Sequence, residues 1–187
     1  DIAPEPLERA RSNIDRYQLS SQVFPVLSNG LQEIPKDADS IVIAGMGVDN
    51  VIAILSAVES RWSSWKQLII QVNSKEYDLR IFLNQSGFRI IHEVCVYDRG
   101  KYYVIIDALF TGAANGYEKL HCLLGPYLMS HPSSTYLAYL KTHLERYRSI
   151  LAATTNDDVE ERVQMIAAYL ERSENDEKFK QYRPEIL

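Results

Sequence analysis

This chain of 187 residues has no long apolar run, only two cysteines and no surplus of basic residues. No apolar stretch approaches the roughly 20 residues that a membrane-spanning helix needs, so we expect no membrane segment. The two cysteines, Cys95 and Cys122, form neither a disulfide framework nor a CxxC pair, and we expect buried thiols in a cytoplasmic protein. No histidines, cysteines and acids are spaced like metal ligands. A net charge of -5 argues against a generally basic nucleic-acid binder, although it allows a local basic patch.

The stretch Ile41–Gly47 carries the clearest structural signal. It opens with four small or β-branched apolar residues in a row, a pattern typical of a parallel strand buried on both faces. Gly45 and Gly47 then permit a sharp turn and a close approach of the backbone to a ligand. Apolar residues at helical spacing follow, and Asp49 or Asn50 could cap that helix. A strand, a glycine turn and a helix in this order indicate a ligand site, although glycine can also serve the turn's geometry alone.

Two segments upstream of this unit are weaker candidates for the same site. Asp1 precedes an amphipathic helix and could be the acid that binds ribose hydroxyls, but a charged terminus is the commoner case. Residues 22–27 are predicted to form a short strand, in which Pro25 suggests an edge position. Asn29 and Gly30 then form a turn, from which the asparagine side chain could contact a base.

A second buried strand is predicted at Gln67–Asn73. Its carboxyl end carries two amide side chains, Gln71 and Asn73, which is more polar than a core strand requires. Either amide could instead cap the next helix, a role for which Ser74 competes.

A β-hairpin and a helical tail are predicted for the rest of the chain. Two β-rich runs, residues 88–97 and 101–109, flank the short polar turn Asp98–Gly100. A parallel sheet that ends in an antiparallel hairpin resembles the C-terminal half of the sheet in many S-adenosylmethionine-dependent methyltransferases. Two apolar stripes at spacings of three and four residues then predict an antiparallel helical hairpin that turns at Ala152–Asp158.

Eight short stretches, taken in chain order, share one pattern. They are Asn13–Leu19, Ser28–Leu31, Ile43–Gly47, Leu68–Asn73, Leu79–Arg80, Gly87–Phe88, Lys101–Tyr103 and Leu124–Leu128. In this order and spacing they resemble the bacterial tRNA (adenine22-N1)-methyltransferase family. The resemblance implies an α/β fold with a Rossmann-like class I methyltransferase domain over residues 1–112 and a coiled-coil helical domain over residues 113–187. It also implies that the family's first strand and first glycine-rich loop, which holds the methionine part of the cofactor, lie upstream of Asp1.

The resemblance further implies S-adenosylmethionine as the cofactor and tRNA as the partner, without a metal. The residues expected to hold the cofactor are Asp1, Asn29, Gly30, Ala44, Gly45, Met46 and Gly47. Gln71 and Asn73 are the expected catalytic residues. Adenine N1 would attack the methyl group in line, with the enzyme chiefly supplying alignment. The adenine would leave its stack in the folded tRNA to reach the cofactor.

A tRNA partner requires a basic surface on this acidic chain. Residues 61–101 contain seven lysines or arginines and four aspartates or glutamates, a local balance of +3. The candidate RNA-binding residues are Lys66, Arg99, Lys101, Tyr103, Lys141, Arg146 and Arg148. Such charges are more often a solvated face than a binding site.

Two alternatives to this enzyme stay open. Val48, Val72 and Val104 stand where the family usually has glycine, proline and glutamate, respectively. These departures suit a noncatalytic relative that binds RNA or a protein partner. A methyltransferase acting on a small molecule, with the helical hairpin as a homodimerisation device, is the other alternative.

Overall fold

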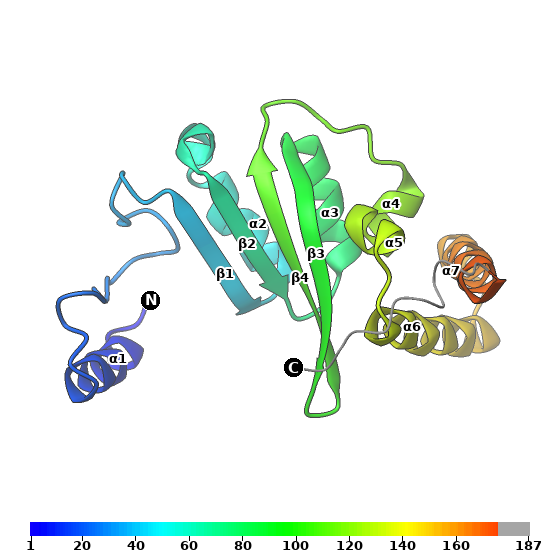
Figure 1. Cartoon of the computed structure of the whole chain (residues 1–187), viewed down its shortest axis with the longest axis horizontal. Helices are drawn as coiled ribbons and strands as arrows, with labels where there is room; N and C mark the ends of the chain where they lie inside the picture. The colour runs from blue at the N-terminus through cyan, green and yellow to red at the C-terminus, as the bar shows by residue number, and fades with distance from the viewer. Residues whose placement is uncertain (176–187) are drawn as a thin grey trace.

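The computed structural model describes residues 1–175, in which a mixed sheet separates an N-terminal helix from a C-terminal group of helices (Figure 1). The strands are β1 (Ser40–Met46), β2 (Gln67–Val72), β3 (Phe88–Asp98) and β4 (Lys101–Phe110). The helices are α1 (Pro4–Arg16), α2 (Val48–Ser56), the 3-10 helix η1 (Glu59–Ser64), α3 (Glu76–Gln85), α4 (Lys119–Leu124), α5 (Pro126–Ser130), α6 (Ser134–Ala153) and α7 (Asp157–Asn175).

The sheet confirms the predicted change from parallel to antiparallel pairing. Its strand order is β1-β2-β4-β3, with β1 parallel to β2 and β4 antiparallel to both of its neighbours. The hairpin turns through Arg99 and Gly100, which both have positive φ. Because Gln71 near the end of β2 pairs with Ile105, residues 98–101 project past the carboxyl ends of β1 and β2 (Figure 1).

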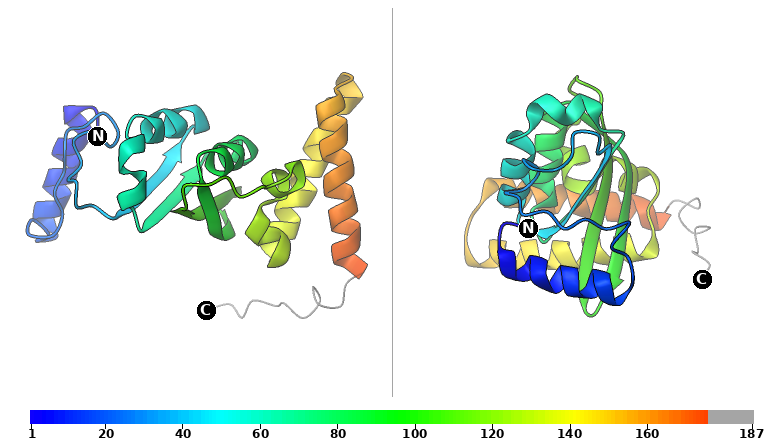
Figure 2. Two further views of the ribbon diagram at one scale, coloured as in Figure 1. Left: turned by 90° about the horizontal axis from the view of Figure 1, so that it is seen from above. Right: turned by 90° about the vertical axis from the view of Figure 1, so that its left-hand side faces the viewer.

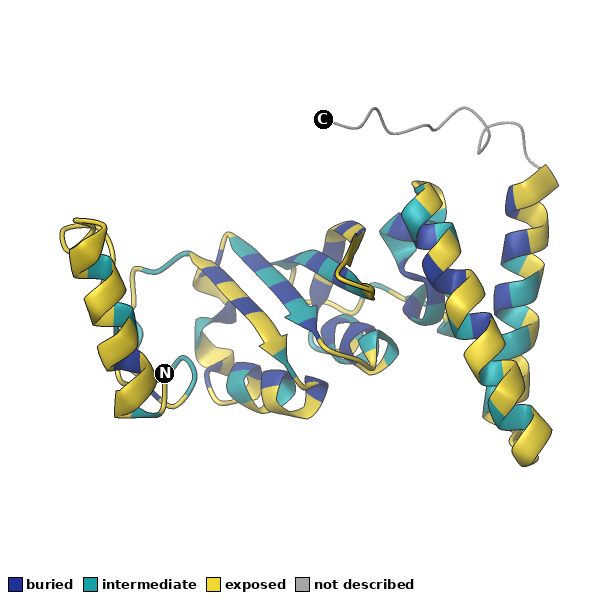
Figure 3. Ribbon diagram, turned by 90° about the horizontal axis from the view of Figure 1, so that it is seen from below, coloured by how far each residue is buried: buried dark blue, intermediate teal, exposed yellow. Residues whose placement is uncertain are grey.

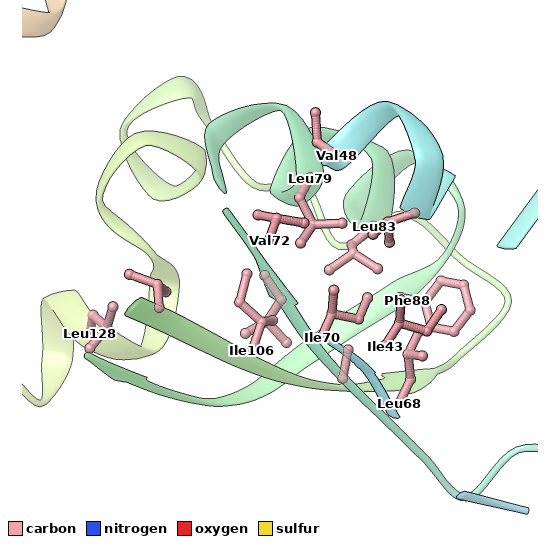
Figure 4. Close-up of a cluster of buried hydrophobic side chains, with 14 of the residues drawn as sticks. Ile43, Val48, Leu68, Ile70, Val72, Leu79, Leu83, Phe88, Ile106 and Leu128 are labelled. Carbon is pink, nitrogen blue, oxygen red and sulfur yellow. The ribbon is translucent and has the colours of Figure 1, made fainter. Parts of the chain in front are cut away.

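The hydrophobic core lies between the sheet and the two helices α2 and α3. Figure 4 shows Ile70 and Ile106 of the sheet facing Leu79 and Leu83 of α3, and all four side chains are fully buried. Three further core residues are Val48, Val72 and Val104, none more than 2% exposed. The valines at which this sequence departs from the resembled family therefore contribute packing.

The opposite face of the sheet is much more open, so the prediction of a strand buried on both faces is wrong. Val42 is 66% exposed, whereas Ile41 and Ile43 on either side of it are buried, and Figure 3 shows this alternation along β1. The N-terminal helix α1 stands away from the sheet (Figure 2). An unbroken apolar run predicts a strand, but it does not determine whether one face of the sheet or both faces are covered by other elements.

The strand predicted at residues 22–27 is absent. The Gln22 and Val23 N–H groups instead donate to the Leu19 carbonyl in a turn. Farther along, the Asp1 amino group donates to the Val26 carbonyl at 3.0 Å, and the Ser28 N–H donates to the Asp1 carbonyl at 2.8 Å. No other segment within residues 1–175 runs alongside it as a strand. A strand needs a ladder partner for its backbone groups, and local sequence cannot supply one.

The helical hairpin is confirmed. α6 and α7 pack against each other, and Asn156 caps α7 by accepting a hydrogen bond from the Val159 N–H at 3.1 Å. Ser133 caps α6 in the same way through the Tyr136 N–H. The helical domain predicted to reach Leu187 is described as far as Asn175. None of the helices within the described residues is both long and apolar enough to cross a membrane.

Candidate functional site

The turn between β1 and α2 is open on its outer side. Gly45 has a φ of +75°, which residues other than glycine rarely adopt. Gly47 has an ordinary φ of -72° and forms the N-cap of α2. Within the described residues, a Cβ atom at either glycine would meet nothing within 4 Å. The prediction that Asp49 or Asn50 caps α2 is wrong, because no side chain caps the helix. A ligand can therefore approach this backbone closely.

Two amide side chains from β2 hold the turn. The pairing of β1 with β2 shifts register between Ala44 and Met46, which removes Gly45 from the regular ladder. The Gly45 N–H instead donates to Gln71 Oε1 at 2.8 Å, and the Gly45 carbonyl accepts from Asn73 Nδ2 at 2.9 Å. Both polar backbone groups of Gly45 are thus satisfied by side chains, which explains why an apolar strand ends in two amides.

The two amides differ in what they leave free. Gln71 uses both ends of its side chain, because its Nε2 also donates to the Val72 carbonyl at 2.7 Å. Asn73 is exposed, and within residues 1–175 its Oδ1 accepts no hydrogen bond. Neither amide caps α3, nor does Ser74, since the N-cap position of that helix is Lys75 and no side chain caps it. Asn73 therefore offers an unused acceptor at the carboxyl edge of the sheet.

The predicted Asn29–Gly30 turn lies beside α2. A Cβ on Gly30 would come within 2.9 Å of the Ile54 side chain, so the turn packs tightly against the last turn of the helix, at the end away from Gly47. The Arg61 guanidinium donates to three carbonyl oxygens within residues 31–35 and fixes the following loop. Asn29 itself is exposed. The structure therefore places this turn and the Gly45–Gly47 turn on the same helix.

Asp1 lies at the exposed start of the chain. Its carboxylate accepts a hydrogen bond from the Ala3 N–H at 3.0 Å, at the N-cap of α1. The side chains next to the glycine turn differ in exposure: Ala44 is exposed, whereas Met46 is half-buried and packs against the core.

Two of the predicted RNA-binding lysines already have carboxylate partners. Lys66 precedes β2 and lies 2.6 Å from Asp39, at the opposite end of the strand from Asn73. This ion pair lowers the pKa of Asp39, chiefly through its hydrogen bond with Lys66. Lys141 lies 2.9 Å from Glu174 of α7. Both lysines are less available to phosphates than the sequence suggested.

The other candidates gather nearer the carboxyl edge. Lys101 and Arg146 line one groove together with Asn73, and within residues 1–175 neither of them forms an ion pair. Arg99 lies in the hairpin turn beside Asp98, and Arg148 is exposed on α6. Tyr103 is the last candidate. It follows Tyr102, which lines the groove, and successive residues of a strand point to opposite faces, so Tyr103 faces away from the groove.

A buried ion pair that the sequence analysis missed joins the sheet region to the helical domain. Arg80 of α3 and Glu93 of β3 lie 2.7 Å apart and are each 2% exposed. Arg80 also donates to the Cys122 carbonyl at the end of α4, and Glu93 accepts from the Tyr127 N–H at the start of α5. Each helix end thus receives the charge that its dipole favours. Within the described residues, no three metal-ligating side chains converge on a metal site.

The mixed sheet, its terminal antiparallel hairpin and the open glycine turn at its carboxyl edge define a Rossmann-like α/β protein of the S-adenosylmethionine-dependent methyltransferase class. The chain matches the family model of TrmK, tRNA (adenine(22)-N(1))-methyltransferase, over residues 1–175. It therefore belongs to the TrmK family.

Individual relatives agree with this assignment. The tRNA (adenine(22)-N(1))-methyltransferase of Bacillus subtilis is 26% identical over 180 residues, which are 93% of this chain and 76% of that protein. The structure of Streptococcus pneumoniae Sp1610 has a TM-score of 0.84 at 24% identity, covering 91% of this chain and 79% of that one. Sp1610 in complex with S-adenosyl-L-methionine gives a TM-score of 0.82 at 25% identity, with 91% and 78% covered.

Proposed function

We propose that this chain transfers a methyl group from S-adenosylmethionine to N1 of an adenine in tRNA, at the edge formed by the Gly45–Gly47 turn and Asn73. The observation that supports the proposal is the pair of hydrogen bonds by which Gln71 and Asn73 hold Gly45 while the turn stays open. Membership of the TrmK family supports the substrate and the cofactor.

The residues of the turn fit a cofactor. Among residues 1–175, no atom lies within 4 Å of a Cβ built at Gly45 or Gly47, and no side chain caps the first turn of α2. We assign cofactor binding to Ala44, the two glycines and the backbone of Met46, with Asn29 and Gly30 reaching the same helix from the preceding loop. When bound, S-adenosylmethionine supplies a methyl group on a sulfonium centre that is already a good leaving group.

Asn73 is the residue best placed to orient the base. Its Nδ2 is engaged with Gly45, so its free Oδ1 can accept a hydrogen bond from the exocyclic amine of adenine, which adjoins N1. The base becomes cationic on methylation, and an amide oxygen beside it would stabilise that charge. Gln71 positions the turn and does not contact the base, because both ends of its amide are engaged in hydrogen bonds to the backbone.

Substitution of Asn73 by alanine tests the proposal. We expect the Asn73→Ala variant to lose at least about 100-fold in methylation of an unmodified tRNA, the range for one aligned polar group, with little change in melting temperature. The product is measured as 1-methyladenosine by mass spectrometry, and cofactor binding by calorimetry. Gln67→Ala, which removes an amide from the other end of the same strand, is the control. Normal turnover in the Asn73→Ala protein would reduce Asn73 to a structural role.

The tRNA is proposed to bind on the side of Lys101 and Arg146, with Arg99 and Arg148 nearby, while Tyr103 lies on the other face of β4. With tRNA as the substrate, we expect the activity in the cytoplasm. Dimerisation through the helical hairpin stays a prediction, to be checked by light scattering.

A further inference from the structure

A row of aromatic rings runs from the β3–β4 hairpin onto α6. The ring centroids of Tyr97 and Tyr102 are 4.7 Å apart, and those of Tyr102 and Tyr139 are 5.8 Å apart. The row continues from Tyr139 to His143 at 4.3 Å and from His143 to Tyr147 at 6.0 Å. The last three rings follow at intervals of four residues, so they share one face of α6.

The rings of Tyr102, Tyr139, His143 and Tyr147 line a groove of about 600 Å³, which is within the range of small-ligand sites. The opposite wall is Asn73–Asp78, where β2 leads into α3. Asn73, the residue proposed to orient the adenine, therefore lines the same groove as the aromatic rings of α6. Nothing in the methyl-transfer proposal uses this aromatic wall.

The charges in the groove are mixed. Lys101 and Arg146 line it and form no ion pair within residues 1–175. Three further cations are engaged: Lys75 lies 3.7 Å from Asp49, Arg80 is paired with Glu93, and Arg162 lies over the Tyr77 ring at 4.3 Å. Two carboxylates, Glu76 and Asp78, also line the groove. A groove with two available cations and two acids suits a ligand that carries few phosphates.

The aromatic wall is uncharged near neutral pH. Burial, together with the neighbouring Arg146, lowers the pKa of His143 to about 4, so its imidazole is neutral. Burial also raises the pKa of Tyr139, which stays protonated. All four of these residues line the groove, but Tyr139 is only 8% exposed, whereas Tyr102, His143 and Tyr147 are half-buried and have more surface available to a ligand.

We propose that this aromatic groove binds unpaired RNA nucleotides adjacent to the target adenine, with their bases against Tyr102, His143 and Tyr147 and their phosphates at Lys101 and Arg146. The proposal rests on the proposed function for its substrate. Bases in a duplex stack on one another and leave only backbone and groove edges to a protein, so an aromatic wall serves unpaired bases. Extrusion of a base for chemistry removes the stacking partner of its neighbours, and the groove supplies a replacement.

The test separates stacking from charge. Tyr147→Leu should weaken binding of unmodified tRNA by about 5- to 100-fold, the range of one base–aromatic stack, with an unchanged salt slope because no phosphate contact is lost. Arg146→Gln should reduce the slope of log affinity against log salt by about one. Tyr147→Phe should restore most of the binding. Tyr17→Leu, which removes a tyrosine that is 66% exposed outside the groove, is the matched control.

A Tyr147→Leu protein that is folded, binds S-adenosylmethionine and holds tRNA as tightly as the native protein overturns the proposal. If that variant does not fold, ultraviolet crosslinking of the native protein to tRNA carrying 4-thiouridine beside the target adenine replaces it. Crosslinks within residues 73–78, 101–102 or 139–147, which line the groove, support it, and crosslinks confined to other segments overturn it.

The groove and the enzymatic activity can fail separately. Normal methylation with no effect of Tyr147→Leu on tRNA binding removes the groove and leaves the function. Binding of a short single-stranded oligoribonucleotide that depends on Tyr147, in a protein that methylates no tRNA, keeps the groove and removes the function. If the native protein binds neither tRNA nor the single-stranded oligoribonucleotide, the groove proposal is overturned.

Discussion

Arg80 and Glu93 form an ion pair of 2.7 Å that is almost fully removed from solvent. Removing two charges from water is costly, and the cost is offset only when further hydrogen bonds engage both groups. Here those bonds come from the carbonyl end of α4 and the N–H end of α5. The pair therefore fixes the bend through which the helical domain, and with it one wall of the groove, joins the sheet.

Removing one partner of this pair should destabilise the fold severely. We expect Arg80→Met to lower the free energy of unfolding by about 3–5 kcal/mol, because it leaves the Glu93 carboxylate buried without its countercharge. Urea unfolding followed by circular dichroism measures the loss. The Arg80→Met/Glu93→Met double variant should regain only part of it, since both helix ends lose their partners.

Asp39→Asn, which breaks the exposed pair with Lys66, is the control and should change the unfolding midpoint far less. An Arg80→Met protein as stable as the native one would show that the pair holds nothing in place.

Gly125, at the bend itself, should tolerate no side chain. It has a φ of +90°, and a Cβ atom there would lie 2.6 Å from Glu93 Oε2 and 2.9 Å from Arg80 Nη2. Gly125→Ala therefore combines backbone strain with a clash against a fixed pair. Gly100→Ala is the matched control, because Gly100 has a φ of +82° with nothing within 4 Å of its Cβ among the described residues.

The difference between the two glycine variants isolates the clash. Gly100→Ala should lower the free energy of unfolding by about 1–2 kcal/mol, from the left-handed conformation alone. We expect Gly125→Ala to lower the melting temperature clearly further. Equal losses would mean that the ion pair moves aside without cost.

His143 should make the protein sensitive to mild acid. Its ordinary pKa of 6.5 falls to about 4 in the fold through burial and the nearby Arg146. Between these values the unfolded chain binds a proton that the folded protein does not, so stability declines as the pH falls from about 6.5 to about 4. The slope from one such group is at most about 1.4 kcal/mol per pH unit.

Thermal melts across that pH window, with His143→Phe and the exposed His92→Phe compared, measure the effect. The His143→Phe protein should show a shallower decline than the native protein, and the His92→Phe protein should follow the native curve. Parallel curves for His143→Phe and the native protein would assign the acid sensitivity to other groups.

Local chemistry made part of the site predictable. Gln71 and Asn73 stood out because amides are unexpected at the end of an apolar strand, and the structure shows that both hydrogen-bond to Gly45. The hairpin was predictable from the polar turn at Asp98–Gly100. The catalytic role of the two amides stays a prediction.

What the sequence could not show depends on partners that are distant along the chain. Arg80 and Glu93 are ordinary surface residue types, and only the fold buries them together. Tyr102 and Tyr139 come from a strand and a helix, so no local period reveals that their rings meet. The strand predicted at residues 22–27 failed for the same reason, because the pattern cannot say whether a neighbouring strand exists.

Gly47 offers the cleanest test of cofactor binding at the turn. Its φ of -72° suits any residue, and a Cβ atom there would meet no described atom within 4 Å, so Gly47→Leu should leave the melting temperature near that of the native protein. Gly45→Leu would be ambiguous, because the φ of +75° adds strain at that position. A leucine side chain at residue 47 would occupy the space through which a ligand approaches the backbone. We expect Gly47→Leu to weaken S-adenosylmethionine binding at least about tenfold, equivalent to about 1.4 kcal/mol, measured by calorimetry on the folded protein. Native affinity in that variant would make the turn purely structural and would move the cofactor away from it.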